Sequence, residues 1–388
     1  MSVVPPRWIF APVAVFAATA CHAAARTRQP AGPPVERTVT AAALDSLPRL
    51  AVTDGHLVCL ADGQSPCPVD LATANWMHDD RFATWEPNRQ VQIWSPNEPN
   101  PLTVGEVGTA IGQYRSVVSV AANGAGYFVV DAASSNLLLF DGKGHYQSSV
   151  PVPPSGMTHA TGFAGDIPLL QLILPTAADS PAVFEVRELE GPGDTLGRSV
   201  LKVPLPWLRI RDGKPARELP LFPVLPSYAI AADSDIVWSA GDVFSVRRQS
   251  ASGSLRWSLT STATGPAVTP EEISRERARL GLKADAAASA RFDSSVAVTA
   301  KSHAAITGLV LAHDGRVLVL GAQTPARDSI DFYSLGKSGE PRGRFTLPRR
   351  SRVLLFNGDS LLVQRPGANM NQELRWLLLR PGGGAASP

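Results

Sequence analysis

The chain has little cysteine and little charge. Three cysteines occur in 388 residues, and Asp, Glu, Lys and Arg together make up 18% of the chain. The formal net charge is +2, and no block of Lys or Arg resembles a basic tail, so no nucleic acid partner is expected. The N-terminal apolar run Ile9–Ala20 is shorter than the roughly 20 residues that a transmembrane helix needs. The sequence therefore does not predict a membrane-spanning anchor.

The common catalytic motifs are also missing. No Gly-x-Ser-x-Gly segment is present, so a hydrolase nucleophile has no support. Gly105–Gly108 lacks the Gly-Lys-Ser/Thr ending of a phosphate loop. The histidines form no helical metal pair and no short-loop cluster: His22, His56, His78, His145, His159, His303 and His313. We therefore expect no catalytic centre, no resident metal and no cofactor.

Short apolar runs and turn residues are abundant instead. The chain has 34 prolines and 32 glycines, and 44% of its residues are hydrophobic. Six times, two apolar runs flank a tight polar turn, as two antiparallel strands would. The clearest copies are Val117–Ala121 with Tyr127–Val130 around Asn123-Gly124, and Leu309–Ala312 with Arg316–Leu320 around Asp314-Gly315. Asn-Gly and Asp-Gly tolerate positive φ at both central turn positions, so they favour tight hairpins.

This repeat predicts an all-β fold, a six-bladed β-propeller over residues 48–380. The predicted blades span Asp70–Val107, Val117–Val152, His159–Val203, Tyr228–Leu259, Ile306–Leu347 and Arg352–Leu379. The last blade has only three strands of its own. The N-terminal strand around Leu50–Leu60 is free to complete it, which would close the ring and remove exposed strand edges.

Two insertions interrupt the regular spacing. Pro204–Pro226 contains six prolines and should be extended and irregular. Thr262–Ser302 contains one short helix, with Thr269 as N-cap, Pro270 in the first turn and Glu272 completing a capping box. The helix should stop near Gly281. It either forms a lid over the central opening or covers a strand edge.

The N-terminus indicates export. Residues 1–25 read as a signal peptide in which Arg7 is the only charge. Cleavage before Cys21 would allow a lipid on that cysteine, and cleavage after Ala25 would leave no anchor. Residues 26–47 are predicted to be a flexible tether and residues 381–388 a disordered tail. We expect an extracytoplasmic protein, periplasmic or membrane-anchored through lipid, or alternatively secreted.

The other two cysteines lie close together in the sequence. Cys59 and Cys67 flank a polar loop that contains Pro66. In an oxidising compartment they predict a disulfide, which would stabilise the fold by about 2–3 kcal/mol in the chain-entropy model. The alternative is two independent thiols.

The pattern resembles the NHL-type six-bladed β-propellers, and among them bacterial extracytoplasmic proteins predicted to be lipoproteins. The likeness covers roughly Pro48–Arg380. It is carried by the Gly-rich stretch Gly105–Arg115, the strand, turn and strand of Tyr127–Phe140, and the helix start Thr269–Glu272. The resemblance implies the fold. It implies little about function, because propellers include lyases, lactonases, receptors and binding scaffolds.

Propeller geometry still indicates where a ligand would bind. The loops that lead into the innermost strands share one face and ring the mouth of the central channel. The residues predicted at these positions are Tyr114, Arg115, His159, Tyr228, His303 and Arg352. Such a mixed aromatic and cationic rim suits a small anionic or glycan ligand, and it is equally compatible with ordinary solvation.

The leading functional hypothesis is therefore a non-catalytic scaffold that binds an unknown protein, glycan or small anionic ligand. The alternative is a metal-dependent hydrolase or lyase similar to propeller lactonases, with Ca²⁺ or Zn²⁺ as cofactor. Asp131 and Asn136 are of the types that hold such a cation. No complete ligand set from several blades accompanies them.

Overall fold

A computed structural model describes residues 33–382 with internal gaps. The gaps are 62–74, 77–80, 86–89, 96–97, 99, 123–125, 152–158, 165–166, 175, 177–179, 190–195, 212–213, 216–218, 232–233, 282–285, 313, 325–326 and 368–371. The chain divides into two units, Met1–Pro33 and Pro34–Pro388. Every helix and strand below lies in the second unit.

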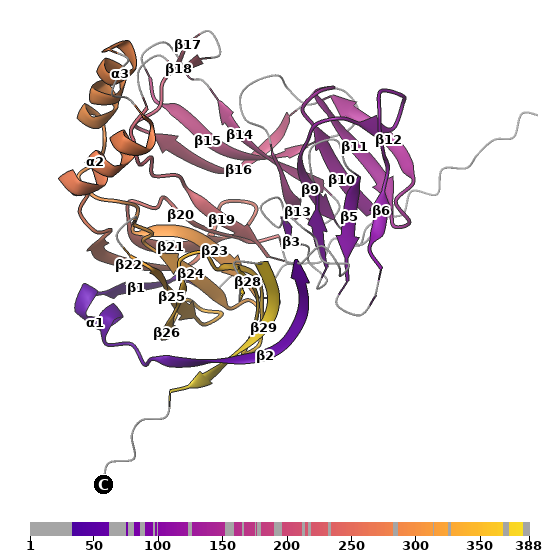
Figure 1. Cartoon of the computed structure of the whole chain (residues 1–388). Helices are drawn as coiled ribbons and strands as arrows, with labels where there is room; N and C mark the ends of the chain where they lie inside the picture. The colour runs from indigo at the N-terminus through magenta and orange to yellow at the C-terminus, as the bar shows by residue number, and fades with distance from the viewer. Residues whose placement is uncertain are drawn as a thin grey trace, which may run out of the picture. The chain divides into compact units, whose positions relative to one another are not determined.

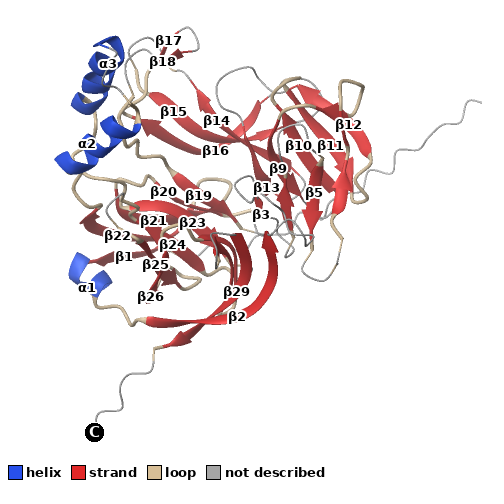
Figure 2. Cartoon of the chain, in the orientation of Figure 1, coloured by secondary structure: helices blue, strands red, loops and turns tan. Residues whose placement is uncertain are grey.

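Six sheets of at least four strands make up most of this unit (Figure 2). Blade 1 has β3 (Asn75–Trp76), β4 (Phe82–Thr84), β5 (Val91–Trp94) and β6 (Leu102–Val104), and blade 2 has β9 (Val117–Ala122), β10 (Gly126–Asp131), β11 (Asn136–Asp141) and β12 (Tyr146–Pro151). Blade 3 has β13 (His159–Ala164), β14 (Ile167–Leu174), β15 (Ala182–Leu189) and β16 (Leu196–Leu205). Blade 4 has β19 (Ser227–Ile230), β20 (Ile236–Ser239), β21 (Val243–Gln249) and β22 (Leu255–Thr264). Blade 5 has β23 (Ile306–Leu311), β24 (Val317–Gly321), β25 (Ser329–Leu335) and β26 (Pro341–Pro348), and blade 6 has β27 (Arg352–Asn357), β28 (Ser360–Pro366) and β29 (Gln372–Pro381).

The innermost strands form a closed series. β3 contacts β9, β9 contacts β13, β13 contacts β19, β19 contacts β23, β23 contacts β27, and β27 contacts β3 again. Apolar side chains fill the spaces between neighbouring blades. Val91 and Ile93 of blade 1, for example, share one buried cluster with Val120 and Val129 of blade 2. The predicted six-bladed β-propeller is therefore confirmed.

The N-terminal segment completes blade 6, as predicted. β2 (Leu50–Ala61) pairs antiparallel with β29 along its whole length, from Leu50 opposite Pro381 to Ala61 opposite Gln372. Figure 1 shows the two strands side by side, β2 in indigo and β29 in yellow. The early and late parts of the described chain thus share one sheet, which is the step that closes the ring.

The residues before β2 also belong to the propeller. β1 (Val35–Val39) pairs in parallel with β22 at the outer edge of blade 4. It is followed by α1 (Ala41–Asp45), which Thr40 caps and which buries Leu44. Pro48 then accepts a hydrogen bond from the backbone N–H of Arg344 in blade 5, at 2.9 Å. We call residues 35–61 the strap, because they cross the outer edges of blades 4, 5 and 6.

The structure of the strap shows that the predicted flexible tether, residues 26–47, is wrong in its second half. Residues 35–39 and 41–45 form a strand and a helix inside the stretch 26–47, so the second half of that stretch is not a flexible linker. Val35 and Val39 are too few apolar residues to predict a strand. The edge of β22 supplies the hydrogen bonds that fix their backbone, and a local pattern cannot reveal such a partner.

A network of charges joins the strap to blade 6. Arg365 on β28 donates to Asp54 of the strap at 2.8 Å and to Glu373 on β29 at 2.5 Å. Arg375 also donates to Glu373, at 3.2 Å, and to the carbonyl of Gly55. Burial alone would raise the pKa of Glu373, but the hydrogen bonds from Arg365 and Arg375 outweigh it and lower that pKa below its ordinary value.

The hairpins share one turn geometry. Five of them span five residues and have the same two backbone hydrogen bonds. The N–H of the first residue donates to the carbonyl of the fifth, and the carbonyl of the first accepts from the N–H of the fourth. The fourth residue has positive φ and is Gly144, Ser234, Gly253, Gly315 or Gly339. In blade 5, the Asp-Gly pair was expected to have positive φ at both Asp314 and Gly315. Only Gly315 has it. The other example, Asn123-Gly124, lies outside the described residues.

Helices occur mainly in one insertion. α2 (Pro270–Arg279) begins at the predicted capping box of Thr269 and Glu272 and ends before Gly281, whose φ is +65°. α3 (Ala286–Ala297) was not predicted, because Phe292 is its only large buried side chain and no apolar period arises. Arg277 of α2 lies over the Phe292 ring and pairs with Asp293. Among the described residues, no helix is long and apolar enough to cross a membrane.

We expect Glu373→Gln to weaken ring closure. The Glu373 side chain is 9% exposed and holds two arginines that are each 21% exposed. The loss in unfolding free energy should be about 2 kcal/mol, between the roughly 0–1 kcal/mol of an exposed pair and the 3–5 kcal/mol of a fully buried one. Urea denaturation at neutral pH measures it. Glu340→Gln is the matched control, because its partner Arg342 is half exposed and the change should cost less than about 1 kcal/mol.

The same network predicts acid sensitivity. The pKa of Glu373 is lowered from 4.5, so the unfolded chain binds a proton at pH values where the folded chain does not. The stability from Glu373 is therefore present at neutral pH and is lost as pH falls through the lowered pKa. Glu373→Gln should flatten the fall in stability below about pH 4. An unchanged pH profile would contradict this assignment.

Ser234→Gly should stabilise the protein. Ser234 has φ of +66° in the turn where the other four hairpins have glycine. Removing its Cβ should raise the unfolding free energy by about 0.5–1 kcal/mol, because glycine adopts this conformation without steric cost. Gly253→Ala is the reverse test. An added Cβ there meets no atom within 4 Å, so its cost of about 1 kcal/mol would come from φ alone. Equal stability of all three proteins in urea would refute the argument.

Candidate functional site

Strand order decides which loops share a face. Each blade has four antiparallel strands with the innermost strand first, except that β2 supplies the outermost strand of blade 6; β1 adds a fifth, parallel strand outside blade 4. The loops that lead into innermost strands therefore lie on the same face as the loops between second and third strands. We call this the mouth face. It carries the lead-in residues Gln113–Ser116 and Arg349–Ser351, and both insertions.

Asp131 fixes the backbone at Arg115. Its carboxylate is at the end of β10 and is 1% exposed. One oxygen accepts from the backbone N–H of Ser116 at 2.7 Å and of Arg115 at 3.3 Å, and the other accepts from Ser134 at 3.2 Å. Two mouth-face loops of blade 2 are thereby tied together, while Arg115 itself stays exposed.

These contacts also give Asp131 a structural role. Burial alone would raise the pKa of Asp131, but the hydrogen bonds from Ser134, Ser116 and Arg115 outweigh it and lower that pKa. Its oxygens thus already accept hydrogen bonds from the chain, in place of the cation that the hydrolase alternative would need. Within the described ranges, no group of three or more His, Cys, Asp or Glu side chains is placed to hold a metal ion.

Tyr114 lies in the core and not on the rim. It belongs to a short parallel pair, β7 (Glu106–Val107) and β8 (Gln113–Tyr114), formed by the Gly-rich stretch. The side chain is 1% exposed. Its hydroxyl donates to the Val104 carbonyl at 2.6 Å and accepts from the Val91 N–H at 2.7 Å. Burial raises the pKa of Tyr114 to about 12. The residue joins blades 1 and 2.

His303 was predicted to lie on the rim of the channel, but it is buried. Its Nε2 is 2.9 Å from a carboxylate oxygen of Glu272, and its ring centroid is 4.8 Å from that of Phe222. Leu221 donates its N–H to the Thr299 hydroxyl at 2.9 Å. The two insertions are therefore joined to each other beside blade 4. These contacts are those of a packed element and none of them indicates a lid.

The prediction that Pro204–Pro226 is irregular holds in part. The segment contains a two-residue hairpin, β17 (Ile210–Arg211) with β18 (Lys214–Pro215). Trp207 packs against the apolar cluster of blades 3 and 4 and donates its indole N–H to Val224 at 2.9 Å. Pro204, Pro206 and Pro223 are exposed, whereas Pro220 and Pro226 are buried, so the segment runs only partly over the surface.

Tyr228 is half buried and links two blades. Its hydroxyl donates to the Gln171 side chain of β14 at 2.9 Å, and its ring meets that of Phe184 edge-on, with centroids 5.6 Å apart. His159 is the first residue of β13, opposite Gln171, and its side chain lies outside the described residues. The cysteine predictions lie there too. Cys59 is described only as backbone within β2, and Cys21 and Cys67 are not described.

Arg352 is the second predicted cation that stays exposed. It is the first residue of β27, opposite Gln364. Burial lowers the pKa of Arg352, although the residue keeps solvent-accessible surface. Protein atoms therefore pack around the guanidinium, although the residue as a whole keeps exposed surface. Because β27, β3 and β9 contact one another in that order, Arg352 and Arg115 lie on either side of blade 1.

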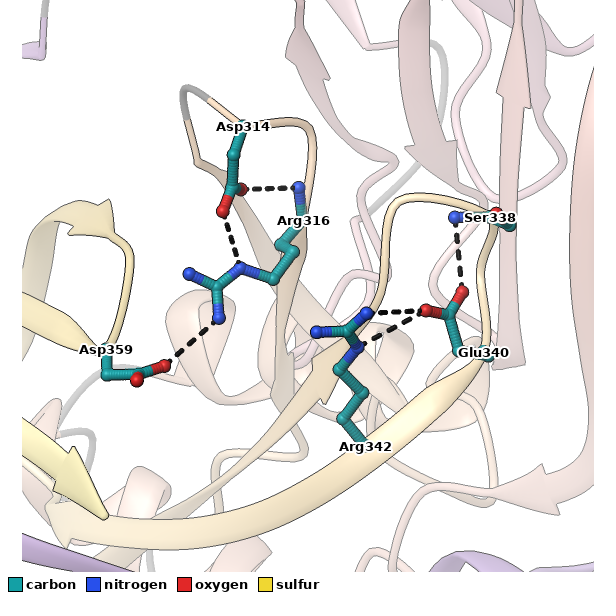
Figure 3. Close-up of polar contacts among 6 residues, drawn as sticks. All are labelled: Asp314, Arg316, Ser338, Glu340, Arg342 and Asp359. Carbon is teal, nitrogen blue, oxygen red and sulfur yellow. Dashed lines mark hydrogen bonds and ion pairs between the residues drawn. The ribbon is translucent and has the colours of Figure 1, made fainter. Parts of the chain in front are cut away.

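The sequence reasoning missed the neighbours of Arg352. Arg349 and Arg350 belong to the same lead-in loop and both are exposed. Three arginines in four residues were a readable signal in a chain with 18% charged residues. On the opposite face, Arg316 pairs with Asp314 and Asp359, and Arg342 pairs with Glu340 (Figure 3).

No protein-family model and no curated protein matches the chain. Among solved structures, a Bacteroides fragilis protein named as an exported one has 9% identity and a TM-score of 0.47, covering 90% of this chain and 100% of its own. A DUF4221 member from Bacteroides vulgatus has 9% identity and a TM-score of 0.46, covering 86% and 97%. A PQQ-bound aldose sugar dehydrogenase from Streptomyces coelicolor has 10% identity and a TM-score of 0.38, covering 86% and 100%. At these scores the likenesses carry no functional argument, and the resemblance to NHL-type propellers stays a prediction.

Proposed function

We propose that this protein is a non-catalytic scaffold that binds an anionic or glycan ligand at the mouth of its ring. The observation that carries the proposal is the exposure of Arg115 and Arg352 on either side of blade 1. Asp131 holds the backbone of Arg115, and strand β27 holds that of Arg352. Guanidiniums are suited to oxyanions, because their N–H groups form a planar fork.

We also propose that the scaffold works outside the cytoplasm. The support is the sequence of residues 1–25, with one charge followed by an apolar run. Expression in a bacterial host with intact-mass analysis tests this. We expect a mature chain that begins at Cys21 with lipid attached, or at Arg26 without it, and the same spectrum reports a Cys59–Cys67 disulfide. An uncleaved chain in the cytoplasm would contradict the proposal.

The binding proposal predicts that Arg115→Ala and Arg352→Ala each weaken the binding of the same ligand. Thermal shift against sulfate, phosphate, glucuronate, oligogalacturonate and neutral maltooligosaccharides identifies a probe, and calorimetry measures its affinity. Loss of one charge-assisted hydrogen bond should cost about 1.5–3 kcal/mol of binding free energy.

Tyr114→Phe is the control. It removes a buried hydroxyl that makes two hydrogen bonds, so it should lower stability by about 1–3 kcal/mol and leave ligand affinity unchanged. If both arginine variants bind the probe as tightly as the unaltered protein, the mouth is not the binding site.

A further inference from the structure

The first hairpin of blade 6 turns through an Asn-Gly pair. The sequence contains two such pairs, and Asn357-Gly358 is the one that lies within the described residues. Strand β27 ends at Asn357, which pairs with Ser360 at the start of β28. Gly358 has φ of +58°, and Asp359 is not among the positive-φ residues. Gly358 and Asp359 therefore form a type II′ turn, which has glycine at its first central position.

The Asn357 side chain and the backbone nitrogen that follows it are both unprotected. Asn357 is exposed. Among the described residues, no group accepts a hydrogen bond from the Gly358 N–H, and none bonds to the Asn357 carboxamide. A Cβ added at Gly358 would meet one atom within 4 Å beyond its chain neighbours, a guanidinium nitrogen of Arg316 at 3.8 Å. Neither hydrogen bonds nor packing shield the two groups.

Asn136 is in the opposite situation. It begins β11, and the next residue, Leu137, is buried and pairs with Val130 of β10. The backbone nitrogen after Asn136 therefore belongs to a residue with a large, packed side chain in the middle strands of a sheet. Asn136 provides an internal comparison for Asn357.

We propose that Asn357 is a site of spontaneous deamidation, a covalent modification in which water is the only co-reactant. Asparagine is among the thermolabile residues, and glycine has no side chain to shield its backbone nitrogen. The Gly358 nitrogen bonds to Cγ of Asn357 and gives up its proton to water. The bond from Cγ to the side-chain nitrogen breaks, and ammonia leaves. The product of this step is a succinimide ring.

Water then opens the ring at one of its two carbonyls. Attack at the side-chain carbonyl leaves an ordinary aspartate, and attack at the main-chain carbonyl leaves an isoaspartate. One water is consumed and one ammonia is released overall, with no oxidation or reduction. Each product carries a new carboxylate, and the isoaspartate also adds one carbon to the main chain.

The longer main chain would alter a turn that two contacts hold in place. Leu379 of β29 donates its N–H to the Asp359 carbonyl at 2.7 Å. The Asp359 carboxylate pairs with Arg316 of blade 5 at 3.1 Å (Figure 3). Because β29 is also the strand that pairs with β2, isoaspartate at position 357 should loosen the blade that closes the ring.

The test is to age the purified full chain in mildly alkaline buffer at constant temperature. Samples are digested and mapped by tandem mass spectrometry, which reports each asparagine separately. Asn357 should gain the mass of OH in place of NH2. Its rate should exceed that of Asn136 by about tenfold or more, a ratio that needs only a modest difference in activation free energy. Mapping keeps any reaction at Asn123 apart from the result.

Ageing the chain in concentrated urea provides the second arm. Unfolding removes whatever protection the turn gives, so the unfolded chain shows the reactivity of the Asn-Gly pair alone. Reaction of Asn357 in the folded protein at a rate similar to that in urea supports the proposal. A folded protein in which Asn357 stays intact while the unfolded chain reacts would overturn it.

Asn357→Gln is the matched variant. It keeps a carboxamide at the exposed position, but its longer side chain must close a larger ring, so the mass gain at position 357 should disappear. A mass gain of the same size within the Arg352–Arg365 stretch of this variant would place the reaction elsewhere and refute the assignment.

Urea midpoints test the structural consequence. The aged unaltered protein should have a lower midpoint than the fresh one, whereas aged Asn357→Gln should keep its fresh value. Asn357→Asp carries the new carboxylate on an ordinary main chain and should also keep its midpoint. If fresh Asn357→Asp is as unstable as the aged protein, the charge is the cause, and the role of the longer main chain is overturned.

Discussion

Backbone pairing between β2 and β29 is the constraint on which the rest of the molecule depends. The chain supplies three strands for its sixth blade, and the fourth comes from its own N-terminal region, more than 300 residues away in the sequence. Closure brings β27 against β3, so that each innermost strand has a neighbouring innermost strand on both sides around the ring. The strap extends the same principle outward, because it also contacts blades 4 and 5. Glu373 and its two arginines add charge pairing at this join.

Closure also determines what the mouth face can do. Six lead-in loops meet there because every innermost strand starts on the same side. The chain uses several of these positions for its own structure: Tyr114 joins two blades, His303 fastens the helical insertion, and Tyr228 reaches across to Gln171. Arg115 and Arg352 are left exposed. Exposed guanidiniums on a backbone that strands and loops hold in place are chemically suited to oxyanions.

The prediction of site residues failed where a side chain's packing, and not its position in a lead-in loop, decides whether it is exposed. The sequence places Tyr114 and Arg115 side by side at one lead-in position. In the structure Tyr114 points into the core and Arg115 lies at the surface, as neighbouring residues of an extended chain do. Asp131 was considered as a cation ligand. Its oxygens instead accept hydrogen bonds from backbone N–H groups of two loops, and the sequence does not show that these loops meet. Arg349 and Arg350 were visible in the sequence and were overlooked.

The sequence alone determined the number of blades, the strand that closes the ring and the start of α2, because each rests on a local pattern of apolar runs, turn residues or caps. Only the tertiary structure decided that residues 35–45 belong to the propeller, that α3 forms, and which lead-in residues are buried. Those outcomes depend on partners far away in the chain: the edge of β22, the Arg277 side chain over Phe292, and the carbonyl of Val104. A single sequence records such partners only as separate residues, because their contact is a property of the folded ring.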